Sequence, residues 1–253
     1  MSLKVSIITV TYNSVGTLQD TIDSLGIQDY PNIEYIIVDG DSKDGTQDII
    51  RANPNVVTSW ISEPDKGLYD AMNKGIKMAT GDIVGIINSD DFYHRSDAIS
   101  KIVQAFEDSG KQSVYADIRF VKPDNLEKTV RYYNSKRFNL HKLSRGIMPA
   151  HPTFFTYRDN FEKYGYYRTD YKIAADFELL VRFLYKHKLG HHYFPIDLMK
   201  MRTGGLSTKS WKSNYIINQE NFRACKENGL KTNYIWLYSR YFTKILEFFP
   251  ALF

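Results

Sequence analysis

IEYIIVDGDSKDGT, at residues 33–46, places an apolar strand directly before an acidic turn. The run from Ile33 to Val38 predicts a buried β-strand, and Asp39 ends it. A carboxylate in that position is costly unless a cation or hydrogen-bond donors meet it. Open α/β sheets bind their ligands at the C-terminal ends of the strands. The stretch therefore predicts an α/β sheet with a binding site at Asp39, although Asp41 and Ser42 also suit a plain turn and helix cap.

The sequence on both sides repeats this pattern of strand and helix. Further strands are predicted at residues 4–10, 56–61 and 83–87. Helices are predicted from the spacing of apolar side chains at residues 18–25, 46–52, 68–79 and 99–106. Alternation of this kind over roughly 110 residues predicts a parallel, doubly wound sheet.

The pattern changes in the second half of the chain. Residues 114–120 alternate like a half-exposed strand, and residues 128–133 are predicted to be its hairpin partner across the turn at 123–125. We expect the region up to about Gly205 to extend the same sheet and to build the other side of a cleft. The predicted organisation is one mixed, mostly parallel α/β domain followed by a helical extension. Its parts are residues 1–112 and 113–208, the two halves of the domain, and residues 209–253.

Composition limits the classes of function. The 253 residues, 43% of them hydrophobic, suit one large core better than two. A net charge of +4 without a Lys/Arg-rich block argues against nucleic acid as a partner. The single cysteine, Cys225, excludes an intramolecular disulfide and fits a reducing compartment. Because no signal peptide precedes the first strand and no apolar run nears the roughly 20 residues of a membrane span, we expect a cytoplasmic protein, soluble or peripheral.

A pair of carboxylates follows the predicted strand 83–87. Asp90 and Asp91, in the sequence Asn88-Ser89-Asp90-Asp91, would repel each other without a cation. Oxygen ligands of this kind suit Mg2+ or Mn2+, which often keep substrate phosphates among their ligands. The alternative is a solvated acidic turn that caps a helix starting near Ser96. The long apolar run before the pair favours a metal and nucleotide site.

Residues 62–75, SEPDKGLYDAMNKG, lead into a predicted helix. Asp65 stands just before that helix, whose free amide groups favour anions. The alternative is a capped surface helix with its apolar stripe against the core. We expect most of the segment to be such a helix, with Asp65, Lys66 and Asp70 near the cleft.

Asp176 opens another helix-like stretch, behind the small apolar residues of Ile173-Ala174-Ala175. A carboxylate placed there would be partly desolvated, which suits a general base. The alternative is an ordinary first-turn acid stabilised by the helix dipole. Glu178 lies two positions further on and should point elsewhere. His151 is a lone histidine, which suits a third metal or phosphate contact or a structural role.

Taken together, these motifs resemble those of inverting family 2 glycosyltransferases with the GT-A fold. The turn after Asp39 resembles the first nucleotide motif, residues 88–91 resemble the metal motif, and Asp176 stands where the family has its base. Residues 62–75 are similar to a subgroup that builds bacterial surface polysaccharides of the colanic-acid type. The order and spacing match over about residues 4–205.

The resemblance implies roles for individual residues. Asp176 would deprotonate the acceptor hydroxyl, and Asp90 and Asp91 would bind the ribose and, with Mn2+ or Mg2+, the diphosphate. The remaining nucleotide contacts would be Thr11, Tyr12, Asn13, Asp39, Asp65 and Lys66. The candidate acceptor or phosphate contacts are His151, Gly67, Tyr69 and Asp70.

Two departures from the family pattern qualify the resemblance. Asn88 stands where many members have the first aspartate of the metal motif, which puts the cation dependence in doubt. The Gln-x-x-Arg-Trp motif of processive synthases is absent from the sequence, so transfer of a single sugar is expected. The halves 1–112 and 113–208 would then bind nucleotide and acceptor respectively.

The expected reaction moves one sugar, with inversion, from a nucleotide-diphospho-sugar to a glycan or polyprenyl-diphosphate-linked acceptor in bacterial cell-surface polysaccharide synthesis. A catalytically inactive nucleotide-binding or assembly module is one alternative. A sugar nucleotidyltransferase is another, but it needs a Gly-rich basic loop after the first strand. Residues 11–16, TYNSVG, contain no basic residue.

The C-terminal residues 233–253 are rich in aromatic side chains, with Arg240 and Lys244 interspersed. Such a helix suits the interface of the inner face of the plasma membrane, and equally packing against the main domain or a partner subunit. The oligomeric state, a homodimer included, is left open. Acceptor contacts are expected between Phe120 and Met148 and around residues 203–207.

Overall fold

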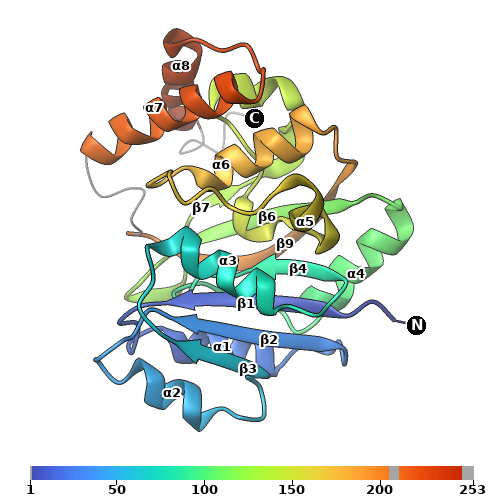
Figure 1. Cartoon of the computed structure of the whole chain (residues 1–253), viewed down its shortest axis with the longest axis vertical. Helices are drawn as coiled ribbons and strands as arrows, with labels where there is room; N and C mark the ends of the chain where they lie inside the picture. Colours follow the sequence, from blue (N-terminus) through green and yellow to red (C-terminus); the bar gives the residue numbers. More distant parts are fainter. Residues whose placement is uncertain (1, 205–210, 247–253) are drawn as a thin grey trace.

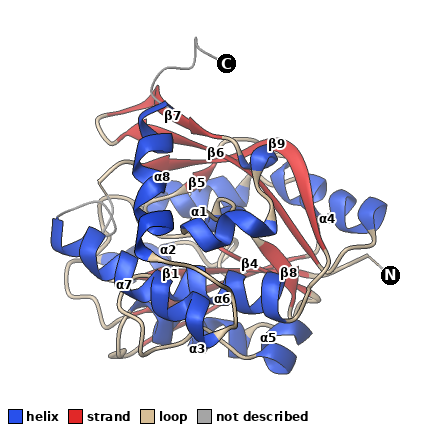
Figure 2. Ribbon diagram, turned by 90° about the horizontal axis from the view of Figure 1, so that it is seen from above, coloured by secondary structure: helices blue, strands red, loops and turns tan. Residues whose placement is uncertain are grey.

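The computed structural model describes residues 2–204 and 211–246, which form one nine-stranded mixed sheet with helices on both faces (Figures 1 and 2). The strands are β1 (Val5–Thr11), β2 (Ile33–Asp39), β3 (Ser59–Ser62), β4 (Ile83–Ile86), β5 (Phe92–Tyr93), β6 (Ser113–Lys122), β7 (Asn125–Tyr133), β8 (Phe155–Tyr157) and β9 (His191–Arg202). The α-helices are α1 (Leu18–Gly26), α2 (Thr46–Ala52), α3 (Leu68–Met78), α4 (Ala98–Ser109), α5 (Asp159–Tyr164), α6 (Ala175–Leu180), α7 (Trp211–Glu227) and α8 (Tyr234–Leu246). The strand order is β3-β2-β1-β4-β8-β6-β9-β5, and β7 pairs with β6.

The first four strands run parallel, as the alternation of strand and helix predicts. Strand β3 begins at Ser59 rather than at Val56, because the amides of Val56 and Val57 bond back to the carbonyl of Asn53 in a turn. The register places Thr11 beside Asp39, and Asp39 beside Ser62. Three strand ends therefore meet at one edge of the sheet.

Strand β6 joins the two parts of the sheet. It pairs with β8 and then β7 along one edge and with β9 along the other. The expectation of a half-exposed strand is wrong for its first part, since Ser113 to Ile118 are all buried between these neighbours. The predicted hairpin is confirmed, because β7 follows β6 directly and pairs with it in antiparallel fashion.

Helices cover both faces of the sheet, so alternate residues of each central strand enter different cores. Ile8 and Val10 of β1 pack with α3 and α6, whereas Val5 and Ile7 pack with α1 and α4. Gly85 of β4 lies flat against Phe155, where a side chain would overlap the ring. This close approach joins β4 to β8, the first strand of the second half in the sheet order.

The helices α7 and α8 lie together at the end of the molecule farthest from α2 (Figure 1). Helix α7 packs on α6, and α8 packs on α7 and on the short helix η2 (Leu140–Arg145). None of the described helices is long and apolar enough to cross a membrane. The part of the predicted acceptor region at 205–207 lies outside the described residues.

Candidate active site

Asp39 lies fully buried at the end of β2. Its carboxylate accepts hydrogen bonds from the Ser42 amide at 3.0 Å, from the Ser62 hydroxyl at 2.6 Å and from the Ser42 hydroxyl. Hydroxyl and amide groups therefore offset the cost of burying this carboxylate, and no cation is needed to do so. Ser42 belongs to the predicted turn, but the predicted helix cap is wrong, because Gly45 is the residue that precedes α2 and the Ser42 hydroxyl bonds to Asp39 instead.

Tyr12 and Asp65 meet over Gly40, the residue after Asp39. A Cβ atom at Gly40 would lie 2.6 Å from Asp65 Oδ2 and 3.3 Å from the Tyr12 ring, so a larger residue here would displace the Asp65 carboxylate. The Tyr12 side chain is 66% exposed, which leaves most of its ring open to stack on a ligand. Asn13 has a left-handed φ of 48° and accepts a hydrogen bond from the Lys43 amide at 3.1 Å. The predicted nucleotide residues thus gather on one loop cluster.

The loop before α3 is held by its own carboxylates. Asp65 accepts a hydrogen bond from the Gly67 amide at 2.7 Å, and Asp70 accepts one from the Lys66 amide at 3.0 Å. A pocket of about 260 Å³ lies between this loop and residues 169–172. Its lining residues are Lys66, Gly67, Leu68, Tyr69, Asp70, Thr169, Tyr171 and Lys172. The predicted acceptor or phosphate contacts from this loop therefore lie around one cavity.

The two carboxylates after β4 differ in exposure. Asp91 is fully buried, with Oδ2 accepting a hydrogen bond from the Asn88 side chain at 2.9 Å, whereas Asp90 is half-buried. Burial raises the pKa of Asp90. Burial first, and the charge of Asp90 second, raise the pKa of Asp91 well above its usual range. Asn88 therefore holds the carboxylate of Asp91 in place.

This acidic pair fits an open site for a hard divalent cation. Asp91 Oδ1 is buried and has no hydrogen-bond partner among the residues that the structure describes. Within those same ranges no group of three or more His, Cys, Asp or Glu side chains forms a closed metal cage. A cation at Asp90 would relieve the repulsion between the carboxylates and would take its other ligands from phosphate oxygens.

Arg202, at the end of β9, is a contributor that sequence reasoning missed. Its guanidinium donates to the backbone carbonyl of Asp90 at 2.5 Å and forms an ion pair with Asp20. This contact fixes the turn that carries the carboxylates. No spacing in the sequence connects residues 112 positions apart, so only the pairing of β9 with β5 and β6 reveals it.

Asp176, in the first turn of α6, faces His151. The distance from Asp176 Oδ2 to His151 Nδ1 is 3.4 Å, and Asp176 Oδ1 accepts the Phe177 amide at 2.8 Å. His151 therefore lies against the predicted base and not beside the carboxylates of the metal motif. The lone histidine and the helix-opening acid come together only in the folded chain.

Two tyrosines, Tyr69 and Tyr167, lie close enough to Asp176 for its charge to act on their hydroxyl groups. Tyr69 and Tyr167 stack with their ring centroids 5.8 Å apart. Burial first, and then the charge of Asp176, raise the pKa of both hydroxyl groups. The Tyr69 hydroxyl donates to the carbonyl of Ile173, and Tyr69 also lines the pocket at the start of α3. Tyr69 thus connects the loop at Asp65 with the segment that leads to Asp176.

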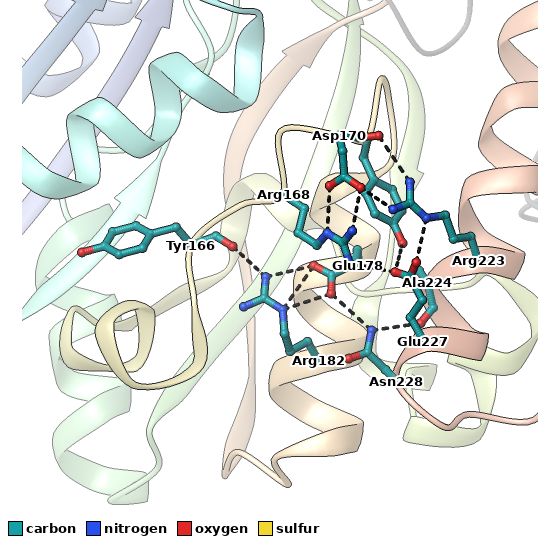
Figure 3. A network of polar contacts seen from close by, with 10 residues as sticks. Tyr166, Arg168, Asp170, Glu178, Arg182, Arg223, Ala224, Glu227 and Asn228 are labelled. Carbon is teal, nitrogen blue, oxygen red and sulfur yellow. Dashed lines mark hydrogen bonds and ion pairs between the residues drawn. The ribbon is translucent and has the colours of Figure 1, made fainter.

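Glu178 points away from Asp176, as its position in the helix predicts. It pairs with Arg182 at 2.9 Å, and both side chains are buried (Figure 3). Arg182 also donates to three backbone carbonyls, those of Tyr164, Gly165 and Tyr166. This network fixes the helix that carries Asp176.

Comparison with known proteins identifies the family. Residues 6–165 match the family model described as glycosyl transferase family 2. The chain belongs to glycosyl transferase family 2. The predicted membership of family 2 is thereby confirmed, and this family 2 member is a glycosyltransferase, whereas the colanic-acid-type subgroup stays a prediction.

Sequence relatives of this family 2 chain occur in mycobacteria. An uncharacterized glycosyltransferase of Mycobacterium tuberculosis (strain CDC 1551 / Oshkosh), MT1564, is 35% identical over 181 residues, which cover 70% of this chain and 68% of the relative. A PGL/p-HBAD biosynthesis glycosyltransferase of Mycobacterium bovis (strain BCG / Pasteur 1173P2) is 28% identical over 220 residues, which cover 85% and 81% of the two chains.

Solved structures show the fold of this family 2 chain. The mannosyltransferase PcManGT from Pyrobaculum calidifontis, in complex with GDP-Man and Mn2+, matches with a TM-score of 0.67 and 20% identity over 90% of this chain and 64% of that one. S. aureus TarS 1-349 in complex with UDP-GlcNAc matches with a TM-score of 0.65 and 17% identity over 86% and 66%. The chain spans 39% of the longer TarS chain. The GT-A fold is confirmed.

Proposed function

We propose that this glycosyltransferase moves one sugar, with inversion, from a nucleotide-diphospho-sugar to a hydroxyl group of a glycan or polyprenyl-diphosphate-linked acceptor. The observation that carries the proposal is the placement of Asp176. One of its carboxylate oxygens is tied to the helix, and the other faces His151. A fixed carboxylate beside an imidazole suits removal of a proton from an attacking hydroxyl.

The donor site is proposed at the ends of β1, β2 and β4, within residues 1–112. The exposed ring of Tyr12 would stack on the nucleobase, and Thr11, Asn13 and Asp39 would shape the pocket beneath it. Thr11 Oγ1 is buried with no hydrogen-bond partner in the described part of the chain, so it has bonding capacity to offer a ligand. The related structures with UDP-GlcNAc and GDP-Man support a sugar nucleotide as donor.

The diphosphate is proposed to bind at Asp90 through Mn2+ or Mg2+. The cation would neutralise charge on the departing diphosphate. Asp90 is half-buried and would contact the cation from the solvent side, whereas the fully buried Asp91 would contribute its carboxylate from the interior side. Arg202 holds the backbone of Asp90 in place. The Mn2+ complex of the related mannosyltransferase supports this assignment.

The chemical step follows from the position of Asp176. Asp176 Oδ2 takes the proton of the acceptor hydroxyl while the oxygen of that hydroxyl forms a bond to the anomeric carbon of the donor sugar. The bond from that carbon to the diphosphate oxygen breaks on the opposite face, and a nucleoside diphosphate leaves. His151 orients the carboxylate. The acceptor would lie against residues 113–208 and the pocket at the start of α3.

A thermal-shift panel tests the donor site. We expect one of UDP, GDP, dTDP or CMP, or a sugar derivative of it, to raise the melting temperature in the presence of Mn2+, because a ligand that binds only the folded state stabilises it. The Asp90→Ala variant should lose most of the part of the shift that depends on Mn2+. EDTA should have the same effect on the wild-type protein.

The Asp159→Ala variant is the matched control, because Asp159 is an exposed carboxylate on α5. It should behave as wild type. Equal shifts in Asp90→Ala and wild type would remove Asp90 from the metal site. A panel without any shift would count against a donor site that is already formed in the free protein.

We further propose that this transfer serves the synthesis of bacterial cell-surface polysaccharide, at the inner face of the plasma membrane. The related mycobacterial PGL/p-HBAD biosynthesis glycosyltransferase supports a role in a biosynthetic reaction. Helix α8 offers a membrane contact, since Ile235, Trp236 and Tyr238 are exposed. Its inner side carries Leu237 and Arg240, which pack against the region of Gly146.

The proposed membrane contact predicts binding to anionic liposomes. We expect the wild-type protein to co-sediment with the liposomes. An Ile235→Ser, Trp236→Ser double variant should bind at least about fivefold more weakly, because the strength of binding increases with the apolar area that the helix buries in the membrane. Truncation after Gly229 is a poorer test, since it also removes the buried Leu237. The control is Tyr215→Ser, an exposed aromatic on α7. Unchanged binding of the double variant would leave a partner chain, such as a second copy, as the occupant of this face.

A further inference from the structure

Glu220 on α7 holds the backbone that leads into α6. Its carboxylate accepts hydrogen bonds from three consecutive amide groups, those of Lys172 at 2.6 Å, Ile173 at 3.0 Å and Ala174 at 2.9 Å. Glu220 is buried. Successive amides that converge on one anion form a strong site, because hydrogen bonds to a charged acceptor are stronger than neutral ones.

The same segment is held from its other side. The carbonyl of Ile173 accepts the hydroxyl of Tyr69, so the amide and the carbonyl of one residue are fixed by two different helices, α7 and α3. Ala174 directly precedes α6, and its carbonyl accepts the amide of Glu178 at 3.0 Å. Asp176 follows two residues later. The direction in which α6 begins sets the direction of the Asp176 side chain.

We infer that Glu220 is a positioning residue for Asp176, supplied by the C-terminal extension, and this inference rests on the proposed role of Asp176 as the base. Lys172 and Ala174 offer no buried polar side chain of their own to hold the segment. Without Glu220, three amides lose their acceptor, and the start of α6 can shift. A displacement of about 1 Å in a reacting group can cost about 10²-fold in rate.

Helix α7 has other contacts with the domain besides Glu220, because its Ala224 and Cys225 are fully buried in the same core cluster as α6. Arg223 pairs with Asp170, and Glu227 pairs with Arg168 at 2.8 Å and with Arg223 at 2.8 Å (Figure 3). Asn228 donates to Glu178 at 3.2 Å. The contact made by Glu220 is therefore separable from the docking of the helix.

The Glu220→Gln variant tests the inference. We expect faster hydrogen exchange at the amides of residues 172–174, and a fall of about 10- to 100-fold in kcat for release of UDP from UDP-GlcNAc or GDP from GDP-mannose. The shift in melting temperature caused by UDP or GDP with Mn2+ should stay as in wild type. A purely structural role would instead lower the melting temperature of the free protein and weaken nucleotide binding along with kcat.

Glu227→Gln is the matched control, since it removes a carboxylate of the same helix that bonds to side chains and not to this backbone. It should leave the exchange of residues 172–174 unchanged and kcat within about twofold. Wild-type exchange and kcat in Glu220→Gln would overturn the inference. If that variant does not fold, Glu220→Asp, which is one methylene shorter, decides by the same two readouts. Asp176→Asn, measured alongside, separates failure of the positioning role from failure of the base assignment. Activity in Asp176→Asn would refute the assignment of Asp176 as the base. An inactive Asp176→Asn together with a fully active Glu220→Gln would refute only the positioning role of Glu220.

Discussion

We expect the Asp176→Asn variant to transfer sugar about 10³-fold more slowly than wild type while it binds the donor nucleotide equally well. An amide has the shape of the carboxylate but cannot accept the proton of the acceptor hydroxyl. It can still accept the Phe177 amide, so the start of α6 should keep its conformation. The measurements are kcat for release of nucleoside diphosphate from the sugar nucleotide that stabilises the protein, and the melting-temperature shift with the same nucleotide.

The variant His151→Gln serves as the comparison for Asp176→Asn. Because His151 only orients the carboxylate in the proposed mechanism, its loss should cost about 10-fold, much less than loss of a general base. Full activity in Asp176→Asn together with a dead His151→Gln would transfer the role of base to the histidine. Weakened nucleotide binding in Asp176→Asn would place Asp176 in the donor site instead.

The second large effect is expected on stability, from Arg182→Ala. The substitution leaves Glu178 as an uncompensated buried charge (Figure 3). It also deprives the carbonyls of Tyr164, Gly165 and Tyr166 of their donor. Breaking a buried ion pair in this way lowers the free energy of unfolding by about 3–5 kcal/mol. Urea denaturation at neutral pH measures the difference.

Arg168→Ala is the matched control for Arg182→Ala. Arg168 forms ion pairs of 2.6 Å with Asp170 and 2.8 Å with Glu227, but its side chain is 37% exposed. Exposed ion pairs contribute about 0–1 kcal/mol to the free energy of unfolding, so the stability of this variant should stay close to that of wild type. Equal losses in the two variants would mean that the buried network does not stabilise α6 beyond an ordinary surface contact.

The sequence predicts β1, β2 and β4 well, because each is a short apolar run that ends at a charged or turn residue, but it places the start of β3 three residues early and does not predict the two-residue strand β5. Helix 46–52 is predicted with its observed bounds, and β1, β2 and β4 differ by one residue at most at each end. The second half is less readable. Its strands pair with segments far along the chain, so β6 is buried on both sides where its alternating pattern indicates one exposed side.

The candidate site also has residues that the sequence identifies and partners that only the folded chain reveals. Asp39, Asp90 and Asp176 can be found in the sequence because each follows or opens a recognisable element. Their partners cannot, since His151 reaches Asp176 and Arg202 reaches Asp90 only through the arrangement of the sheet. The burial of Asp91 also depends on neighbours that local spacing does not encode.

The pairing of β4 with β8 has a consequence for engineering this enzyme. Residues 83 and 84 of the first half bond to residues 157 and 156 of the second, and β5 returns from the first half to pair with β9. A chimera that exchanges residues 113–208 for those of a relative would therefore have to form both strand pairings again, and the residue that replaces Phe155 would have to fit against Gly85. New acceptor preferences are better sought by grafting individual loops onto the intact sheet.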